Sequence, residues 1–185
     1  MTYYGGKELA AAFRTVRKNT VQIAEEIPEN KYDFKPAPEA RSIAHTLAHM
    51  AMSPNFFHYI HSNKVTDMQS INFQQVFAPL VAEEGKPRTK AEIVEMLKTE
   101  GEKFAAFLEG LTENDLSERV AMSPLAGGGS KTRFEMLLSP KEHEMHHRAQ
   151  LMTIQRMIGQ VPHLTRQMQE RMARVQQQAQ PAGQP

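Results

Sequence analysis

Apolar residues recur at the spacing of one helix face in four long stretches of the chain, and this pattern limits the fold more than any other sequence feature. The first stretch carries Leu9, Phe13, Val16, Ile23 and Ile27 at helical intervals, with Thr20 between them. This spacing places the side chains on one stripe of an α-helix. We predict a helix over residues 6–26 and, because three prolines follow, a connection over residues 28–40.

The second stretch, from about residue 41 to about residue 61, keeps the helical period but contains Pro54. Since proline donates no backbone hydrogen bond, we predict one helix that bends at this point. Residues 62–88 are mixed in character. Apolar residues between Phe73 and Leu80 predict a short extra helix there, packed as a flap.

The third and fourth stretches have recognisable ends. Thr89 and Glu92 form a capping-box pattern that begins a helix ending near Gly110. Residues 112–131 contain Pro124 and three consecutive glycines, which predict a loop or hairpin-like connection without a stable helix. The last long helix is predicted over residues 132–159. A second capping box, which includes Pro140, leaves open whether this helix breaks and restarts there.

The end of the chain differs in composition from the rest. Residues 164–178 predict a charged helix, and we expect the last ten residues, rich in glutamine and proline, to be disordered. No stretch of alternating polarity predicts a strand. The expected architecture is an all-α four-helix bundle over residues 1–165, with a short extra helix between its second and third helices. We expect residues 166–185 to form a C-terminal helical extension and a disordered tail.

Composition excludes several classes of function. Lysine and arginine exceed aspartate and glutamate by 22 − 21 = 1, so net charge does not favour nucleic acid or a membrane surface. No apolar stretch is long enough to span a membrane or to act as a secretory signal, and we expect a cytoplasmic protein. The chain has no cysteine, so histidine, aspartate and glutamate are its strong candidate metal ligands.

Two pairs of histidines have the spacing of metal ligands on a helix. His143 and His147 are four residues apart, and so are His45 and His49. Four residues bring two imidazoles to one helix face, and either member of the second pair could complete a site of three imidazoles. The alternative is that these histidines are solvated or hydrogen-bonded only. We predict that the buried row through the first pair includes Met136, Gln150, Ile154 and Met157. His146 is expected to point away from this row. The remaining histidines, His58, His61 and His163, are expected at the surface.

The residues next to the last histidine pair suggest further roles. The string from His143 to His147 has the His-Glu-x-x-His form, which makes Glu144 a candidate catalytic base or a residue that orients an imidazole. Arg148 is a candidate for binding a substrate carboxylate. The alternative is an ordinary ion pair on the helix surface.

Two separated motifs carry a resemblance to a family. Arg41-Ser-Ile-Ala-His-Thr-Leu-Ala-His49, followed by His143-Glu-Met-His-His147-Arg-Ala-Gln150, resembles the DinB-like, YfiT-type metalloprotein superfamily over residues 5–165. The resemblance implies that His49, His143 and His147 bind one divalent transition metal, with zinc or nickel preferred over iron or manganese. It makes His45 a pocket wall or spare ligand, and it is compatible with a homodimer.

The resemblance also implies a reaction class. It favours a metal-dependent thiol transferase that joins a low-molecular-weight thiol to a small electrophilic molecule, and it allows metal-dependent hydrolysis instead. A competing hypothesis from another class is a stress-response binding module, in which a metal is structural or absent. The sequence does not identify the substrate.

Overall fold

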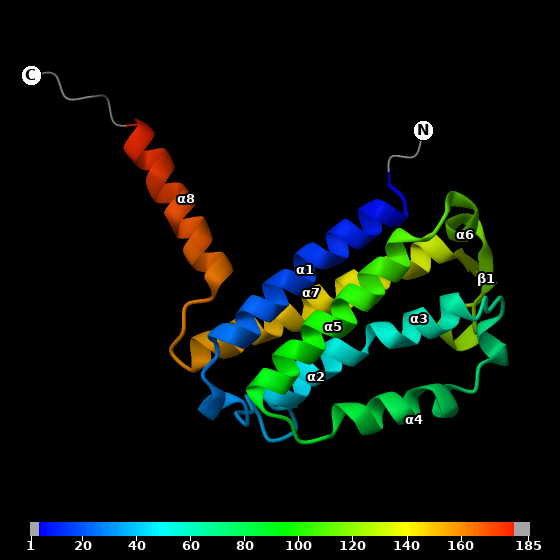
Figure 1. Cartoon of the computed structure of the whole chain (residues 1–185), viewed down its shortest axis with the longest axis horizontal. Coiled ribbons are helices and arrows are strands. Elements are labelled where there is room, and N and C mark those ends of the chain that lie inside the picture. The colour runs from blue at the N-terminus through cyan, green and yellow to red at the C-terminus, as the bar shows by residue number, and fades with distance from the viewer. Residues whose placement is uncertain (1–3, 180–185) are drawn as a thin grey trace, which may run out of the picture.

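The computed structural model describes residues 4–179, and most of them are helical. The bundle consists of α1 (Gly6–Glu26), α2 (Ile43–Met52) continued by α3 (Pro54–Ser62), α5 (Lys90–Glu109) and α7 (Arg133–Met157). In Figure 1, α1 and α5 run side by side, α7 lies behind them, and α2 and α3 together form the fourth member. The predicted all-α four-helix bundle is confirmed.

The capping patterns locate the helix starts. The Thr89 side chain accepts from the Glu92 amide, and the Glu92 carboxylate accepts in return from the Thr89 amide, as predicted. Thr132 begins α7 in the same way. That helix then continues through Pro140 to Met157, so the alternative of a break and restart is wrong. Proline removes one amide donor, but α7 packs into the core both before Pro140, through Leu137, and after it, through Leu151.

The prediction of one bent helix over residues 41–61 is wrong in detail. Two helices, α2 and α3, are separated by Ser53, whose backbone stays helical at φ −57° and ψ −34°. Pro54 takes the first position of α3, where its missing amide proton matters least. The chain therefore turns at Ser53 without leaving the bundle.

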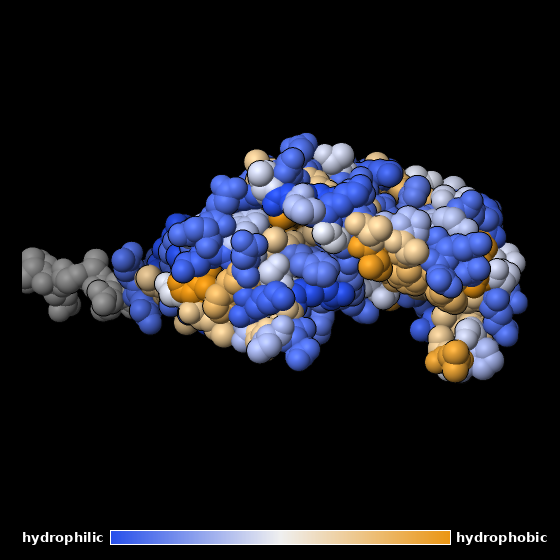
Figure 2. Space-filling view, turned by 90° about the horizontal axis from the view of Figure 1, so that it is seen from below, coloured by the Kyte–Doolittle hydropathy of each residue, from blue (hydrophilic) through white to orange (hydrophobic). Residues whose placement is uncertain are grey.

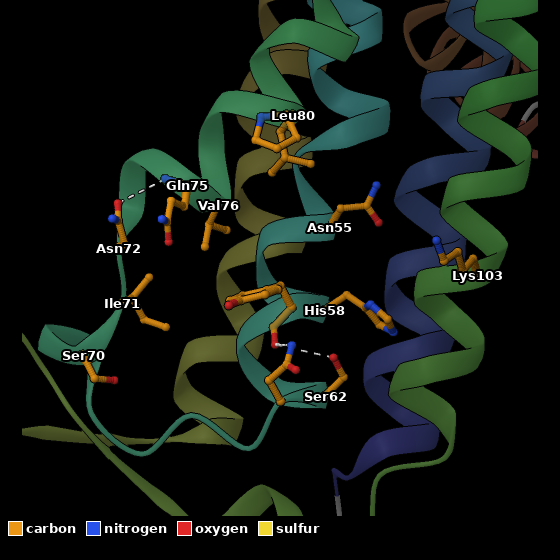
Figure 3. A pocket seen from close by; sticks show the side chains of 13 residues that line it. Asn55, His58, Ser62, Ser70, Ile71, Asn72, Gln75, Val76, Leu80 and Lys103 are labelled. Atoms are coloured by element: carbon orange, nitrogen blue, oxygen red, sulfur yellow. Dashed lines mark hydrogen bonds between the residues drawn. The ribbon is translucent and has the colours of Figure 1, made fainter.

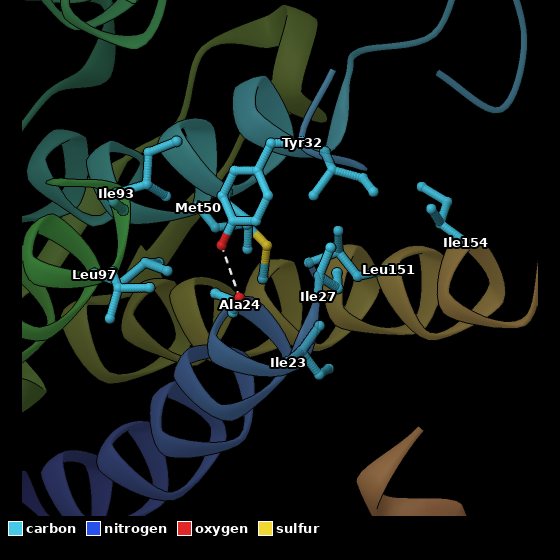
Figure 4. Close-up of a cluster of buried hydrophobic side chains, with 13 residues drawn as sticks. Ile23, Ala24, Ile27, Tyr32, Met50, Ile93, Leu97, Leu151 and Ile154 are labelled. Carbon is cyan, nitrogen blue, oxygen red and sulfur yellow. Dashed lines mark hydrogen bonds between the residues drawn. The ribbon is translucent and has the colours of Figure 1, made fainter. Parts of the chain in front are cut away.

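The core lies between the four bundle helices. Figure 4 shows one cluster, in which Ile23 of α1 and Ile27, directly after its end, meet Leu97 of α5 and Leu151 of α7. Ile23, Ile27, Leu97 and Leu151 are fully buried. Burying each of these side chains contributes about 1.5–3 kcal/mol to the free energy of folding. This packing therefore fixes the relative positions of the helices that carry the histidines.

The connections hold more regular structure than predicted. The extra helix is confirmed as α4 (Phe73–Glu84), but residues 112–131 also contain a short helix, α6 (Glu113–Ser117), where none was expected. A capping box between Thr112 and Asp115 stabilises α6. Two strands, β1 (Arg119–Ala121) and β2 (Ser130–Thr132), pair antiparallel. Strands of three residues are too short to show alternating polarity. The 3₁₀ segments are Glu29–Lys31, Met68–Ser70 and Pro124–Ala126.

The C-terminal helix α8 (His163–Ala179) packs against the bundle only at its start and then projects away from it (Figure 1). Residues 176–179 are helical, so the expectation that they are disordered is wrong, and residues 180–185 lie outside the described part of the chain. The expected division at residue 165 falls within α8. None of the described helices is long and apolar enough to cross a membrane. Figure 2 views the molecule from the side of α4, where apolar and polar surface is mixed.

Candidate metal centre

Three histidines from two helices meet on one side of the bundle. His49 comes from α2, and His143 and His147 come from successive turns of α7. The Nε2 atom of His143 lies 3.1 Å from Nε2 of His49 and 3.2 Å from Nε2 of His147. The candidate ligand atoms of all three side chains lie within 4.8 Å of one another. The structure therefore brings together the three residues that the resemblance implied.

The other ring nitrogen of each histidine has a partner of its own. Nδ1 of His49 lies 3.0 Å from a carboxylate oxygen of Glu84, and Nδ1 of His147 lies 2.8 Å from the amide oxygen of Gln150. Nδ1 of His143 lies 3.2 Å from Oγ of Ser53. Such outer partners fix the orientation of a ligating imidazole and the nitrogen that carries its proton.

The partners indicate where the protons are. A carboxylate and an amide oxygen only accept, so His49 and His147 in their neutral forms carry the proton on Nδ1 and direct an Nε2 lone pair toward His143. His143 can donate to only one of these lone pairs at a time. A cation between the three rings would be bound by all of the facing lone pairs, so the donor set fits a metal ion.

Burial keeps these imidazoles neutral. It lowers the pKa of His49 and of His143 from 6.5 to about 4, and it lowers the pKa of His147 as well. The neighbouring histidines and the guanidinium of Arg41 act in the same direction. Because a metal binds the neutral form of histidine, the three rings are in the ligating state at neutral pH.

A pocket of about 780 Å³ adjoins the cluster. Its lining includes His147, His146 and Gln150 of α7 together with Arg41 and Thr46 at the start of α2. Ile154 and Met157 form an apolar wall. The pocket is large enough for a small organic molecule, and it gives such a molecule access to the side of His147.

The side chain of Glu144 does not join the three converging histidines. Its side chain is 1% exposed, and both of its carboxylate oxygens accept hydrogen bonds of 2.9 Å from the guanidinium of Arg17 on α1. The same guanidinium donates to the carbonyl oxygens of Met50 on α2 and Leu97 on α5. Met50 is four residues before Pro54, so its carbonyl lacks the usual helical donor. The ion pair thus joins all four members of the bundle, and no hydrogen bond links Glu144 to the three histidines.

Other histidines differ from expectation. His61 and His163 were expected at the surface, but they are 2% and 1% exposed. His61 is buried because it follows Phe57 by four residues on the inner face of α3, where it contacts Arg133. His163 lies in the first turn of α8, which packs on α1, and its Nε2 lies 3.3 Å from Asn19. His45 is exposed on α2 and is not one of the converging rings.

The predicted buried row along α7 holds only in part. Met136 and Ile154 are buried, whereas Met157 and Gln150 are exposed. Gln150 sits in the pocket wall and Met157 lies in the last turn of the helix. His146 is exposed, as expected, although its ring lies edge-on to that of His147.

A second pocket, of about 680 Å³, lies between α3 and α4 and reaches Lys103 of α5 (Figure 3). Its lining includes His58 and several neutral polar side chains such as Asn55 and Gln75. None of the three converging histidines lines it. His58 is therefore separate from the candidate metal centre.

Sequence reasoning missed Glu84 and the role of Ser53. No spacing rule links Glu84 to His49, because the two residues come from different helices 35 positions apart. Ser53 occupies the turn between α2 and α3, which was not predicted. Gln150 belongs to the quoted motif, and its position three residues after His147 was the signal available for its contact.

Comparison with known proteins gives the same family. The model of the DinB superfamily matches residues 12–151, which is most of the chain. The chain belongs to the DinB superfamily. The Bacillus subtilis (strain 168) protein YjoA is a DinB relative that is 27% identical over 152 residues, which cover 82% of this chain and 90% of YjoA.

Solved structures of DinB-like proteins share the fold. The crystal structure of YjoA matches with a TM-score of 0.63 at 24% identity, covering 83% of this chain and 94% of YjoA. YfiT from Bacillus subtilis, described as "a probable metal-dependent hydrolase with an unusual four-helix bundle topology", matches with a TM-score of 0.65 at 13% identity, covering 86% and 91%. The mycothiol-dependent maleylpyruvate isomerase matches with a TM-score of 0.60 at 13% identity, covering 82% and 63%. At these identities the structural matches establish the fold alone.

Proposed function

We propose that this DinB-family protein is a metal-dependent enzyme that transfers a low-molecular-weight thiol to a small electrophilic molecule. The observation that carries the proposal is the convergence of the Nε2 atoms of His49, His143 and His147, each of whose Nδ1 atoms has its own partner. These three residues are the proposed ligands of one divalent transition metal. Zinc and nickel are the preferred candidates, with iron and manganese next.

The donor set determines what the metal would supply. Three neutral imidazoles leave a divalent cation with its full charge, so the bound cation would act as a Lewis acid that stabilises the anionic form of a thiol or of water. The chain's own residues hold the imidazoles: Glu84 keeps the proton of His49 on Nδ1, and Gln150 does the same for His147. In the proposed reaction the thiol loses its proton to solvent and its sulfur forms a bond to the electrophilic carbon. Either a leaving group departs from that carbon with the bonding electrons, as chloride does from an aryl chloride, or a multiple bond of the electrophile opens and its other end takes up a proton.

The pocket beside His147 favours an enzyme over a structural metal site. Structural zinc sites are normally closed by four protein ligands, whereas this cluster has three histidines and an adjoining pocket of about 780 Å³. The mycothiol dependence of the isomerase with the same fold supports the thiol reaction. Hydrolysis is the second candidate, because YfiT is described as "a probable metal-dependent hydrolase". Glu144 is not carried forward as the base, since its carboxylate is paired with Arg17. A cytoplasmic location stays a prediction.

Metal analysis followed by an activity screen tests the proposal. We expect the untagged protein to carry about one equivalent of transition metal, His143→Ala to lose it, and the exposed His45→Ala to keep it. Metal-loaded protein should accelerate the conjugation of at least one of several thiols to 1-chloro-2,4-dinitrobenzene. Acceleration of ester cleavage alone would favour the hydrolase instead. Bound metal without either activity would overturn the enzyme assignment in favour of a binding module.

A further inference from the structure

The pocket lined by His147, one of the three converging histidines, also contains an arginine that has no partner among the described residues. Arg41 lies just before the N-cap of α2 and lines the same pocket as His147. Arg41 is exposed, and within residues 4–179 its guanidinium forms no ion pair or hydrogen bond. Arg148 also has no such partner, whereas Arg14, Arg17 and Arg166 are paired with glutamates. An unpaired guanidinium in a pocket offers several donors and a full positive charge to a ligand.

Arg41 and one of the three converging histidines border the same pocket. The lining brings the side chain of Arg41 together with those of His146 and His147. One carboxylate, that of Glu39, also lines the pocket, but it forms no ion pair with Arg41. With a divalent cation between the rings, the pocket would carry a strong positive potential.

We propose that Arg41 anchors an anion-binding subsite beside the three histidines, so that a substrate of the enzyme is a small carboxylate. The inference rests on the proposed function in one respect. The carboxylate would bind Arg41, and a second polar group of the same molecule would reach the proposed metal. Guanidinium groups bind carboxylates through two parallel hydrogen bonds, which fix orientation as well as position. The apolar wall of Ile154 and Met157 can pack against the carbon chain between the two polar ends.

Arg148 is the alternative that the sequence suggested for this role. It follows His147 directly in the chain, but it does not line the pocket, and its charge acts on His163 at the start of α8. Arg148 is therefore a matched control, since its removal changes net charge equally without changing the pocket.

Titration of dicarboxylates tests the subsite. Oxalate, malonate and succinate are titrated calorimetrically into metal-free and metal-loaded protein, with uncharged succinamide as the neutral probe. For the best-binding dicarboxylate we expect Arg41→Gln to weaken binding by about tenfold or more, which is the scale of a lost charge-assisted hydrogen bond. Arg148→Gln should bind like the unmodified protein, and succinamide should not distinguish the variants.

The outcomes separate this inference from the proposed function. If the protein binds metal but its dicarboxylate affinity is the same in Arg41→Gln and Arg148→Gln, or no dicarboxylate binds, the subsite is refuted and the metal site stands. If no metal binds, yet the metal-free protein binds dicarboxylates through Arg41, the subsite stands and the enzyme proposal fails. Arg41→Lys, which keeps the charge but not the paired geometry, should show intermediate affinity.

Discussion

Arg17 and Glu144 form an ion pair in the middle of the bundle, where both side chains are nearly inaccessible to water. Gly101 on α5 makes room for the pair, because a Cβ atom at this position would lie 2.7 Å from Cγ of Arg17. Every hydrogen bond that the guanidinium donates crosses to another helix. At the scale of single residues, Glu144 thus acts in holding helices together.

The substitution Glu144→Gln separates this role from a catalytic one. It would leave the Arg17 charge buried without its counter-charge, so we expect a loss of about 3–5 kcal/mol in the free energy of unfolding. Metal content at saturating metal should be unchanged. The control is Glu142→Gln, an exposed glutamate two residues earlier, which should change stability by less than about 0.5 kcal/mol. Unchanged stability together with lost activity would instead indicate that Glu144 takes part in catalysis.

Sequence spacing predicts some site residues and not others for a physical reason. His143 and His147 share one helix, so their convergence follows from the helical repeat alone. The contribution of His49 rested on a family motif, because no spacing rule relates residues on different helices. Glu84 lies in a segment of mixed character and meets His49 only through tertiary packing, so neither argument reached it.

At the scale of elements, helix starts were predictable where a side chain caps the backbone. Thr89 is such a case. Thr112 caps α6 in the same way, but no helix was predicted there, because a proline and three glycines follow in the same segment. The presence of a proline alone does not determine whether a helix ends. Pro140 lies within α7, whereas Pro54 takes the first position of α3, directly after the turn at Ser53.

The helix α4 brings a carboxylate to the candidate metal centre. Glu84, in the last turn of α4, is 8% exposed, and burial raises its pKa. Its contact with Nδ1 of His49 makes α4 a support of the site as well as a cover.

Glu84→Gln tests this support. Loss of an outer carboxylate typically costs 10–100-fold in metal affinity, and we expect about this decrease in competition with a chelating dye, with one equivalent still bound at saturation. The neighbouring Glu83 pairs with Lys86 and Arg88 at the surface, so Glu83→Gln removes the same charge without touching His49. Equal affinities in the two variants would show that α4 does not support the metal centre.

At the scale of the whole molecule, the bundle buries several ionisable rings that the helical pattern alone did not place. The bundle core followed from apolar periodicity, but the burial of His61 and His163 depended on how α3 and α8 pack. Both rings have a lowered pKa because burial disfavours the charged form. These histidines therefore connect the stability of the entire fold to pH.

The pH dependence of unfolding follows from His61. Burial, with the charge of Arg133, lowers its pKa from 6.5 to about 4 in the folded protein. Between these values the unfolded chain binds a proton that the folded protein does not, so the free energy of unfolding falls as pH falls, by up to about 1.4 kcal/mol per pH unit. Urea unfolding of metal-free protein at pH 7, 6 and 5 should show this decline. His61→Gln should decline less steeply, while the exposed His45→Gln should parallel the unmodified protein. Parallel declines for all three proteins would mean that His61 titrates normally and is not buried as described.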